Sequence, residues 1–568
     1  MSVVGMLGGL ADLTLKDALV RIGGAALCTH VIFNRVEPLS PPLVAFLLVV
    51  EPLALGWMLL QHQTHFALSF LISVLITFSA YHATLITSII LYRLSPFHPL
   101  ARYPGPLRLK LSQVFGFQIA LEGGRHRELQ KMHEEYDTDV LRLGPNEIII
   151  RDASAISAIM GTNGLGKGPG ADGRAGYRTD RTLINWRDAE VHAKRRKPWI
   201  RGTNTTALKE YEPVIAARAG QLVDMVLRGR DGTVNLSQCI KFFAYDFMSD
   251  MAFGGGGELM RDGDVHGLMH RMDAGIKAAI LVESLPWLSF YMEKVPSMVA
   301  KFRQLREQGA QRARQRILRG ALTKDLFHYL NNDDGAEAVS PSVEAVAAEG
   351  VLVILAGSET TSGVLSTIMY LLMRNPDVYK KLQQEVDKFY PPGENALDCK
   401  CHSEMTYLEA VINESLRLFP VQPSGSQRAT RGKGIVAGNH YIPPYTSVRI
   451  NTWSIHRDPR NFSPSPESFW PERWLIAEDP SSYKSSTSKP FIHNANAFIP
   501  FSFGPSNCVG KNLALKEMKM VLCHLVQQVA VRFADGYDVE SYEREMKDWF
   551  AMQVPELPVV VTQRSEKA

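Results

Sequence analysis

The chain has 568 residues, of which 45% are hydrophobic and 21% are charged, so most of it is expected to be globular. The 62 basic and 58 acidic residues give a formal net charge of +4, which is too balanced to indicate a nucleic-acid partner. The six cysteines are too few and too scattered for a disulfide framework, and they fit a reducing, cytosolic setting.

The N-terminal region contains long apolar segments. Residues 66–92 carry no charged side chain, and this length is sufficient for a helix to span a bilayer. Residues 42–60 are a second candidate, interrupted by Glu51, and residues 22–33 are a third, shorter one. A cleaved signal peptide fits poorly because the longest apolar run lies too far from the N-terminus. A buried hairpin in a soluble protein is the alternative.

Positive charge and prolines follow these segments. Basic residues lie at Arg93, Arg102, Arg108 and Lys110. Such residues flank the cytoplasmic side of a membrane helix, so the rest of the chain should face the cytosol. Four prolines between residues 94 and 107 prevent a helix and stiffen the backbone. We therefore expect a membrane anchor of one to three transmembrane helices in residues 1–95, and a separate domain in residues 96–568.

The second domain is predicted to be mainly helical with a small β region. Residues 140–150 have β-branched residues on both sides of Gly144-Pro145, which favours a short hairpin. Helical patterns then dominate to about residue 425. Residues 434–451 are rich in strand-forming residues, with a turn at Gly438-Asn439.

Two helical segments carry charged residues at regular spacing. In residues 186–199, His192 and Arg196 are four positions apart, so both could hold adjacent carboxylates from one helix face. In residues 407–419, Glu414 and Arg417 are three apart. The alternatives are a basic surface helix and an exposed ion pair, which would contribute little stability.

Residues 343–373 form a long apolar stretch without proline, which predicts a buried helix. Inside it lies the sequence Ala356-Gly-Ser-Glu359-Thr360-Thr. Polar residues in an apolar helix are costly unless they have partners. A threonine hydroxyl can bond the carbonyl one turn earlier and bend the helix. We expect a functional break here, with Gly357 leaving room for a ligand; a capping or surface Ser/Thr cluster is the alternative.

The segment Phe501-Ser-Phe-Gly504-Pro-Ser-Asn-Cys508-Val-Gly510 precedes an apolar helix. The two glycines would let the backbone turn tightly and approach a flat ligand. The start of the helix would stabilise a Cys508 thiolate. A buried structural cysteine is the alternative for this residue alone.

These segments together resemble the cytochrome P450 family. The cysteine segment resembles Phe-x-x-Gly-x-Arg-x-Cys-x-Gly, with Ser506 in place of Arg. The polar site in the apolar helix resembles Ala/Gly-Gly-x-Asp/Glu-Thr-Thr/Ser. The pair Glu414 and Arg417 matches Glu-x-x-Arg, and Pro471-Glu-Arg473-Trp resembles Pro-Glu-Arg-Phe. The chain is most similar to microsomal P450s of filamentous fungi, basidiomycetes included.

The resemblance implies a P450 fold that binds haem b. Cys508 would be the thiolate ligand of the iron, framed by Phe501, Gly504 and Gly510. Thr360 would hydrogen-bond dioxygen at the iron, and Glu359 would help to relay protons to it.

The same resemblance implies contacts further from the iron. In the absence of a basic residue at Ser506, the haem propionates would be held by His192, Arg196 and Arg428. A buried network would join Glu414, Arg417 and Arg473.

The implied function is a monooxygenase that inserts one oxygen atom from O2 into a lipophilic small molecule, such as a terpenoid or another secondary metabolite. Its pocket would be formed by residues 165–180, 270–295, the helix near Ala356, and 421–426. Within residues 270–295 we expect contacts from Leu285, Pro286, Trp287 and Phe290.

Electrons would come from NADPH-cytochrome P450 reductase, because no flavin or nicotinamide motif occurs in the chain, and cytochrome b5 is a further potential donor. The enzyme would sit in the endoplasmic reticulum membrane, in contact with lipid, with its catalytic domain in the cytosol. Lysines expected on the reductase-facing surface are Lys194, Lys197, Lys511, Lys516 and Lys519.

Two other classes remain open. One is a thiolate-haem isomerase, dehydratase or peroxygenase that needs no reductase. The other is a non-catalytic haem protein of the membrane. An intact Glu359-Thr360 pair argues against both.

Overall fold

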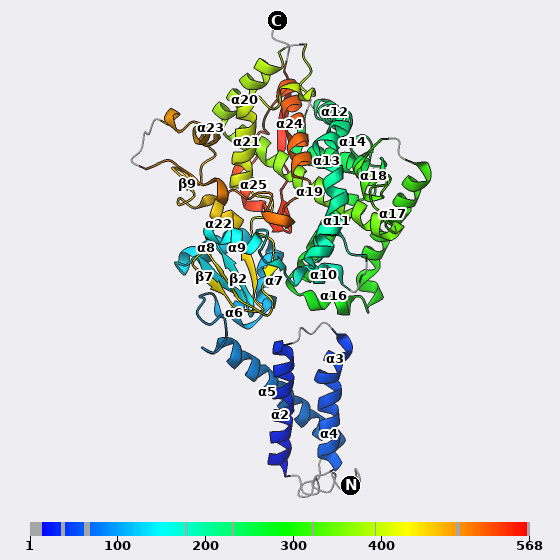
Figure 1. The fold of residues 1–568 in the computed structure, drawn as a ribbon, viewed down its shortest axis with the longest axis vertical. Helices are drawn as coiled ribbons and strands as arrows, with labels where there is room; N and C mark the ends of the chain where they lie inside the picture. The colour runs from blue at the N-terminus through cyan, green and yellow to red at the C-terminus, as the bar shows by residue number, and fades with distance from the viewer. Residues whose placement is uncertain are drawn as a thin grey trace.

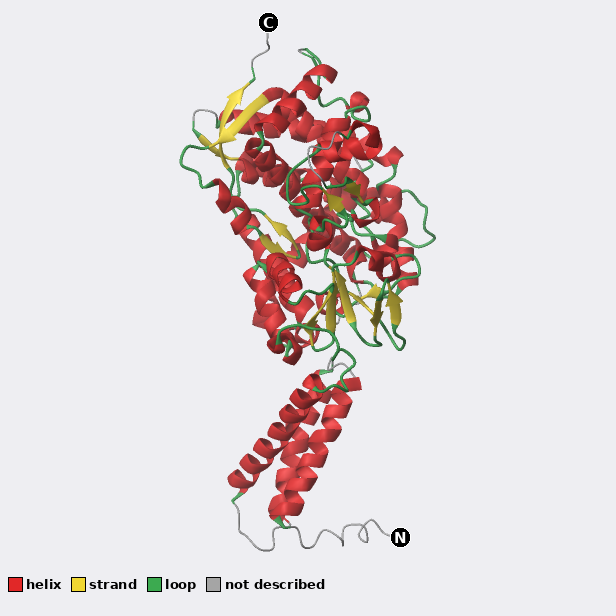
Figure 2. Cartoon of the chain, turned by 90° about the vertical axis from the view of Figure 1, so that its left-hand side faces the viewer, coloured by secondary structure: helices red, strands yellow, loops and turns green. Residues whose placement is uncertain are grey.

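The computed structural model describes residues 14–35, 40–61, 69–176, 178, 180–229, 232–320, 323–391, 393–483 and 489–564. These residues form a group of N-terminal helices next to a larger, mainly helical domain with small sheets (Figures 1 and 2). The larger domain is mainly helical with a small β region, which confirms the predicted fold class.

The N-terminal helices are α2 (Leu15–Arg35), α3 (Pro41–Ala45), a π-helix (Phe46–Val50), α4 (Glu51–Gln61) and α5 (Phe70–Leu94). Both α2 and α4 pack against α5. The segments Pro41–Leu60 and Phe70–Leu94 are long and apolar enough to cross a membrane. Of the predicted span 66–92, residues 66–68 lie outside the described residues. The shorter candidate 22–33 lies within α2.

Glu51 lies in an apolar segment, but its carboxylate has hydrogen-bond partners on the neighbouring helices. Its carboxylate accepts hydrogen bonds from Thr29 at 3.2 Å and from Tyr81 at 3.0 Å. Thr29 and Tyr81 also contact each other at 2.7 Å, and Tyr81 contacts the carbonyl of Leu47 in the π-helix at 2.9 Å. A polar cluster therefore joins α2, α4 and α5.

The five-stranded sheet of the larger domain has the order β1-β2-β8-β5-β3. Its strands are β1 (Val140–Gly144), β2 (Glu147–Ile150), β3 (Gly166–Lys167), β5 (Arg428–Ala429) and β8 (Ser447–Ile450). The predicted hairpin at 140–150 is the antiparallel pair β1–β2, and β2 pairs with β8 in parallel. The antiparallel pair β3–β5 places Lys167 opposite Arg428.

The other strands form small sheets. They are β4 (Thr233–Asn235) with β11 (Val529–Phe533) and β14 (Pro558–Gln563), β6 (Ile435–Ala437) with β7 (His440–Ile442), β9 (Phe462–Ser463) with β10 (Ile492–His493), and β12 (Lys547–Trp549) with β13 (Ala551–Gln553). The strand-rich region predicted at 434–451 contains β6, β7 and β8. Gly438 has a φ of +56° in the β6–β7 turn, which explains the glycine at this position.

The largest hydrophobic core lies around α19 (Val343–Arg374). Of the most apolar stretch of this helix, 61% is buried, against 17% for Phe70–Leu94, so α19 is a core helix and not a span. Helices that contribute to this core are α12 (Thr205–Arg228), α13 (Leu236–Phe253), α20 (Pro376–Phe389), α21 (Thr406–Leu418) and α24 (Lys511–Gln528).

The remaining helices surround the sheet and the core. Between the N-terminal helices and α12 they are α6 (Leu107–Leu111), α7 (Gln113–Glu122), α8 (Arg125–Glu135), α9 (Ile156–Met160), α10 (Gly170–Ala175) and α11 (Ala189–Gly202). Later in the chain they are α14 (Leu259–Asp262), α15 (Leu268–Ser284), α16 (Pro286–Met292), α17 (Pro296–Arg319), α18 (Leu326–Leu330), α22 (Thr452–Arg457), α23 (Glu472–Glu478) and α25 (Val539–Glu545).

Candidate active site

A cavity of about 810 Å3 lies between α19 and the segment that contains Cys508. It brings together most of the predicted site residues, although they come from distant parts of the sequence. The predicted residues that line it are His192, Glu359, Thr360, Arg196, Arg428, Phe501, Cys508 and Gly510. Gly504 is not among the lining residues, and its contribution is to the backbone conformation of the cysteine segment.

The cysteine segment folds back on itself before α24. The amide of Cys508 donates to the carbonyl of Phe501 at 2.9 Å. Gly504 has a φ of +71°, and a Cβ atom there would lie 2.0 Å from the carbonyl oxygen of Met160, so only glycine fits. Gly510 has an ordinary φ of −83°, and a Cβ atom would contact Cys508 at 3.9 Å. The turn argument therefore holds for Gly504 and is wrong for Gly510.

The Cys508 thiol faces the cavity, which is why it is exposed although protein surrounds it. Burial raises its pKa, and the backbone at Gly510 and the charges of Arg196 and Lys511 only partly offset this. The start of the helix therefore favours the thiolate, as expected, but burial outweighs this effect. A coordinated metal ion, in contrast, deprotonates a thiol outright.

Beside Cys508, the cavity has a cluster of basic side chains, His192, Arg196 and Arg428, and none of them forms an ion pair with a carboxylate among the residues that the structure describes. Arg196 donates to the backbone carbonyl of Asn507 at 2.8 Å and to its side-chain oxygen at 2.6 Å. Burial and the positive charges of Lys167, Arg196 and Arg428 lower the pKa of His192 to about 4. Burial and Arg449 lower the pKa of Arg428 to about 10. Such a cluster is suited to a ligand with negative charge.

Lys167 belongs to this cluster and was missed in the sequence. It lies opposite Arg428 in the β3–β5 pair and lines the cavity. Burial, followed by the charges of Arg428, Arg174 and Arg196, lowers its pKa to about 7. Like charges directly opposite on neighbouring strands are destabilising, so the arrangement indicates a site for an anion. Its neighbours in the sequence, Gly164-Leu-Gly-Lys167-Gly-Pro, are rich in glycine and gave no signal for a strand or a site.

Across the cavity, Glu359 and Thr360 form the acid–alcohol pair of α19. The Thr360 hydroxyl donates to the carbonyl of Ala356 at 2.7 Å, as predicted. The helix nevertheless continues unbroken from Val343 to Arg374. A Cβ atom at Gly357 would lie 2.4 Å from the Met248 side chain, so this glycine also allows α13 to pack closely. Gly357 lines the cavity, as expected for a residue that leaves room for a ligand.

Glu359 is 5% exposed and forms an ion pair with Lys241 of α13 at 3.2 Å. Burial raises the pKa of Glu359, and Lys241 partly opposes this shift. Lys241 also contacts Asp273 of α15 at 2.9 Å. The side chain of Asp273 is 42% exposed, so these three groups connect the cavity with solvent.

The predicted network of Glu414, Arg417 and Arg473 is present in the structure and fully buried. Arg417 binds both carboxylate oxygens of Glu414 at 2.8 Å, and Arg473 binds one at 3.1 Å. The indole of Trp474 and the amide of Trp470 also donate to this carboxylate, at 3.0 and 3.1 Å. The pair is thus a core ion pair and not a surface one.

The comparisons with known proteins agree with this geometry. The family model for cytochrome P450 matches residues 104–560. The chain belongs to the cytochrome P450 family. It is 32% identical over 488 residues to "Cytochrome P450 monooxygenase FCK2" of Fusarium pseudograminearum, which covers 85% of each chain.

Two other fungal P450s are similar over most of their length. "Cytochrome P450 67" of Uromyces fabae is 28% identical over 562 residues, covering 95% of this chain and 98% of its own. "Tryprostatin B 6-hydroxylase" of Aspergillus fumigatus is 30% identical over 495 residues, covering 86% and 84%. The protein is a P450 monooxygenase, and its family implies a haem-thiolate cofactor.

The residues of this P450 fit such a cofactor. The cavity presents a single cysteine thiol, Cys508, beside a group of cations that no carboxylate neutralises directly. A porphyrin with two propionates supplies the missing negative charge. Ser506 also lines the cavity, and Arg196 lies within hydrogen-bond distance of the adjacent Asn507, so a cation is present next to the position where the family usually has one.

Two sets of predicted residues need correction. Leu285, Pro286, Trp287 and Phe290 are not among the residues that line the cavity; Ile276, Ile280 and Glu283 of α15 line it instead. On the proposed reductase-facing surface, Lys516 is paired with Glu212, and Lys519 with Glu409. The prediction of a basic docking surface is therefore reduced to Lys194, Lys197 and Lys511.

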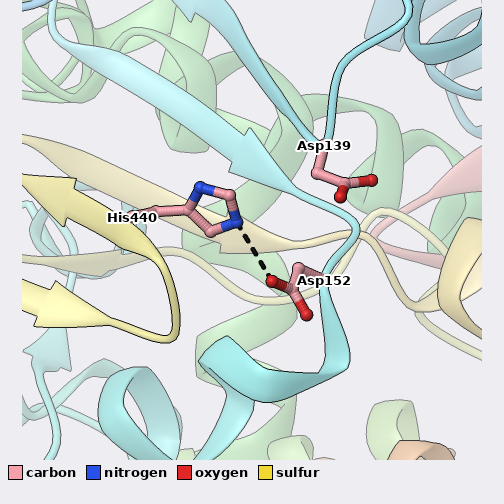
Figure 3. Close-up of side chains that lie close together, drawn as sticks. All are labelled: Asp139, Asp152 and His440. Carbon is pink, nitrogen blue, oxygen red and sulfur yellow. Dashed lines mark hydrogen bonds and ion pairs between the residues drawn. The ribbon is translucent and has the colours of Figure 1, made fainter.

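Outside this cavity, one group of possible metal ligands occurs among the described residues: Asp139, Asp152 and His440 (Figure 3). Figure 3 shows His440 hydrogen-bonded to Asp152, while the carboxylate of Asp139 points away from the histidine. Both oxygens of Asp139 are bound by Arg460. The group is therefore explained by salt bridges.

Proposed function

We propose that this P450 uses electrons from NADPH, delivered by a separate cytochrome P450 reductase, to insert one oxygen atom of O2 into a lipophilic small molecule. The observation that carries this proposal is the acid–alcohol pair, Glu359 and Thr360, which lines the same cavity as Cys508. A haem-thiolate isomerase, dehydratase or peroxygenase would not need a proton route to bound dioxygen.

The cofactor proposed is haem b, held by Cys508 and by the basic side chains of Lys167, His192, Arg196 and Arg428. When bound, it would supply the iron at which dioxygen is activated. Arginine forks suit carboxylates because they donate two parallel hydrogen bonds. Phe501 and Gly510, which line the cavity, would pack against the ring.

The proton route would begin at the surface. Asp273 is in contact with solvent, Lys241 lies between it and Glu359, and Glu359 lines the cavity beside Thr360. Because burial raises the pKa of Glu359, this carboxyl group retains a proton more readily than an exposed glutamate. The Thr360 hydroxyl, which donates a hydrogen bond to the carbonyl of Ala356, would pass the proton from Glu359 into the cavity.

For the substrate we propose a secondary metabolite, with terpenoids as one class. The apolar part of the cavity wall, including Ile276, Ile280 and Leu355, is suited to a hydrocarbon body. One relative is named for hydroxylating tryprostatin B, which supports a small-molecule substrate. Cytochrome b5 is a further proposed electron donor.

We also propose that residues 1–95 anchor the enzyme in the endoplasmic reticulum membrane by three crossings, with residues 96–568 in the cytosol. Support for a third crossing comes from α2, which packs along α5 through Ile22, Ala26, Tyr81 and Leu85. Three crossings place the N-terminus in the lumen, whereas two place it in the cytosol. A glycosylation acceptor fused before Met1 would be modified only in the first arrangement.

The decisive experiment on the reaction uses purified full-length enzyme and its reductase with a panel of lipophilic compounds. We expect product that contains one atom of labelled O2 and depends on NADPH and reductase. Thr360→Ala should retain the reduced carbon-monoxide spectrum but form far less product. Product formation that needs no oxygen, or that proceeds equally well from hydrogen peroxide alone, would favour the isomerase or peroxygenase alternatives. An intact haem spectrum without turnover of any compound by the parent enzyme would favour the non-catalytic one.

A further inference from the structure

One end of the cavity is built from charged residues of several distant segments. Arg449 of β8 binds Glu147 of β2 at 2.7 Å and Glu283 of α15 at 2.8 Å. Arg174 of α10 binds the second oxygen of Glu283 at 2.6 Å. Asp548 of β12 is hydrogen-bonded to Ser424. The carboxylates at this end of the cavity, Glu147, Glu283 and Asp548, therefore already have hydrogen-bond or ion-pair partners.

Arg125, the first residue of α8, also lines the cavity here. Among the residues that the structure describes, its guanidinium has no hydrogen-bond or ion-pair partner. Burial and the charge of Arg449 lower its pKa, and Glu147, Asp548 and Glu283 counteract this through space. Arg125 is partly exposed and lines the cavity, so its guanidinium is open to a charge-assisted contact with a ligand that carries an acidic group.

Arg125 is fixed in place by the turn before it. Gly123 has a φ of +80°, and its carbonyl accepts a hydrogen bond from the amide of Asp548 at 2.7 Å. The indole of Trp549 donates to the carbonyl of Leu121 at 3.0 Å. The α7–α8 turn is therefore attached to β12, so Arg125 is held next to Asp548 at the cavity wall.

This cation is distinct from those that would hold the haem. The charges that act on Arg125 are those of Arg449, Glu147, Asp548 and Glu283. The charges that act on His192, beside Cys508, are those of Lys167, Arg196 and Arg428. Arg125 comes from α8 and Arg428 from β5, and Arg449 of the strand β8 beside β5 lies between these two groups. Apolar residues of α15 and α19, such as Ile280 and Leu355, lie on the cavity wall.

From this arrangement we infer that the substrate carries a carboxylate, which Arg125 binds while the apolar body of the molecule extends along α15 and α19. This inference rests on the proposed function, because it assigns Arg125 to the substrate of the same cavity. An arginine can hold a carboxylate by two parallel hydrogen bonds, which fixes the orientation of the molecule as well as its position. Arg125 would then determine which carbon faces the iron.

The test compares binding of matched acids and esters to the haem-loaded, full-length enzyme. A series of n-alkanoates of increasing chain length and their methyl esters would be titrated while the shift of the Soret band is recorded. We expect at least one acid to bind roughly tenfold more tightly than its ester, as a charge-assisted contact would produce. In Arg125→Gln, this preference should disappear, while affinity for the ester stays unchanged.

Two further variants make the result specific. Arg125→Lys keeps the charge but not the fork, so it should retain part of the preference. Lys131→Gln removes an exposed charge from the same helix and should behave as the parent enzyme. Equal binding of acids and esters by the parent, or an equal loss of both in Arg125→Gln, would overturn the inference. The carbon-monoxide spectrum and reductase-dependent oxygen uptake report separately on the proposed function.

Discussion

The ammonium group of Lys241 lies 3.2 Å from the carboxylate of Glu359, which precedes Thr360 in the central helix. Burial would lower the pKa of Lys241, but the carboxylates of Glu359 and Asp273 outweigh this effect and raise it. A lysine that remains charged in this position favours the ionised form of Glu359. Lys241 is therefore a positioning residue for the proposed proton route.

Lys241→Met should impair proton delivery without affecting haem loading. Removing the cation raises the pKa of Glu359 further, so the alkaline limb of the pH profile of kcat, along which this proton donor is lost, should shift to higher pH. We expect kcat to fall by roughly tenfold, a modest part of what general acid–base catalysis contributes, and more hydrogen peroxide per NADPH.

Two variants serve as controls for Lys241. Lys241→Arg should restore most of the rate, and Asp273→Asn should give an intermediate rate because it cuts only the link to solvent. A merely structural role would lower haem content in Lys241→Met and leave the pH profile in place, contrary to this prediction.

The network around Glu414 predicts a graded response to mutation. Arg417→Ala leaves the buried carboxylate short of its strongest partner, which typically costs about 3–5 kcal/mol. We expect little or no haem-loaded protein, measured as the carbon-monoxide difference spectrum per unit of expressed chain. Trp474→Phe removes only one of five hydrogen bonds to Glu414 and should cost about 1 kcal/mol, with haem retained.

The ion pair between Arg532 and Asp535 provides a control for this network, because its residues are also three positions apart. Both side chains are exposed, 59% and 86%, so Asp535→Asn should change little. Normal haem loading in Arg417→Ala would contradict the proposed role of the Glu414 network.

Lys167 should contribute to haem retention. Because its pKa is lowered to about 7 by burial and neighbouring cations, the propionates of haem would raise it and gain a charge-assisted contact. Lys167→Met should therefore release haem to excess apomyoglobin about tenfold faster, whereas Lys167→Arg should not. Lys194→Met, which removes an exposed charge from α11, is the control. An unchanged transfer rate in Lys167→Met would exclude Lys167 from the propionate site.

The residues that local spacing could identify differ from those that required the fold. Glu414 and Arg417 share one helical turn, so their pairing follows from the sequence, and the Cys508 segment carries its own glycine pattern. Lys167 and Arg428 are brought together only by strand pairing, and Arg125 meets Asp548 only through the α7–α8 turn. Long-range pairing of this kind leaves no periodic signal, because each residue is unremarkable in its own segment. The packing of Gly357 against Met248 could not be predicted for the same reason, since Met248 lies on another helix.

Glu349 of α19 predicts a pH dependence of stability. Burial raises its pKa to about 7, although Leu183 donates a hydrogen bond to it at 3.3 Å. In the unfolded chain, this carboxyl group has its ordinary pKa of 4.5. Between pH 4.5 and about 7, the folded state therefore holds a proton that the unfolded state releases. Stability therefore falls as pH rises through this window, by about 3 kcal/mol in total.

Glu349→Gln removes this loss of stability. We expect its advantage in denaturant midpoint over the parent to be small at pH 5 and to grow towards pH 8, while Glu344→Gln, on the exposed start of the same helix, shows no such trend. An advantage that is the same at both pH values would show that Glu349 is not held neutral by its surroundings.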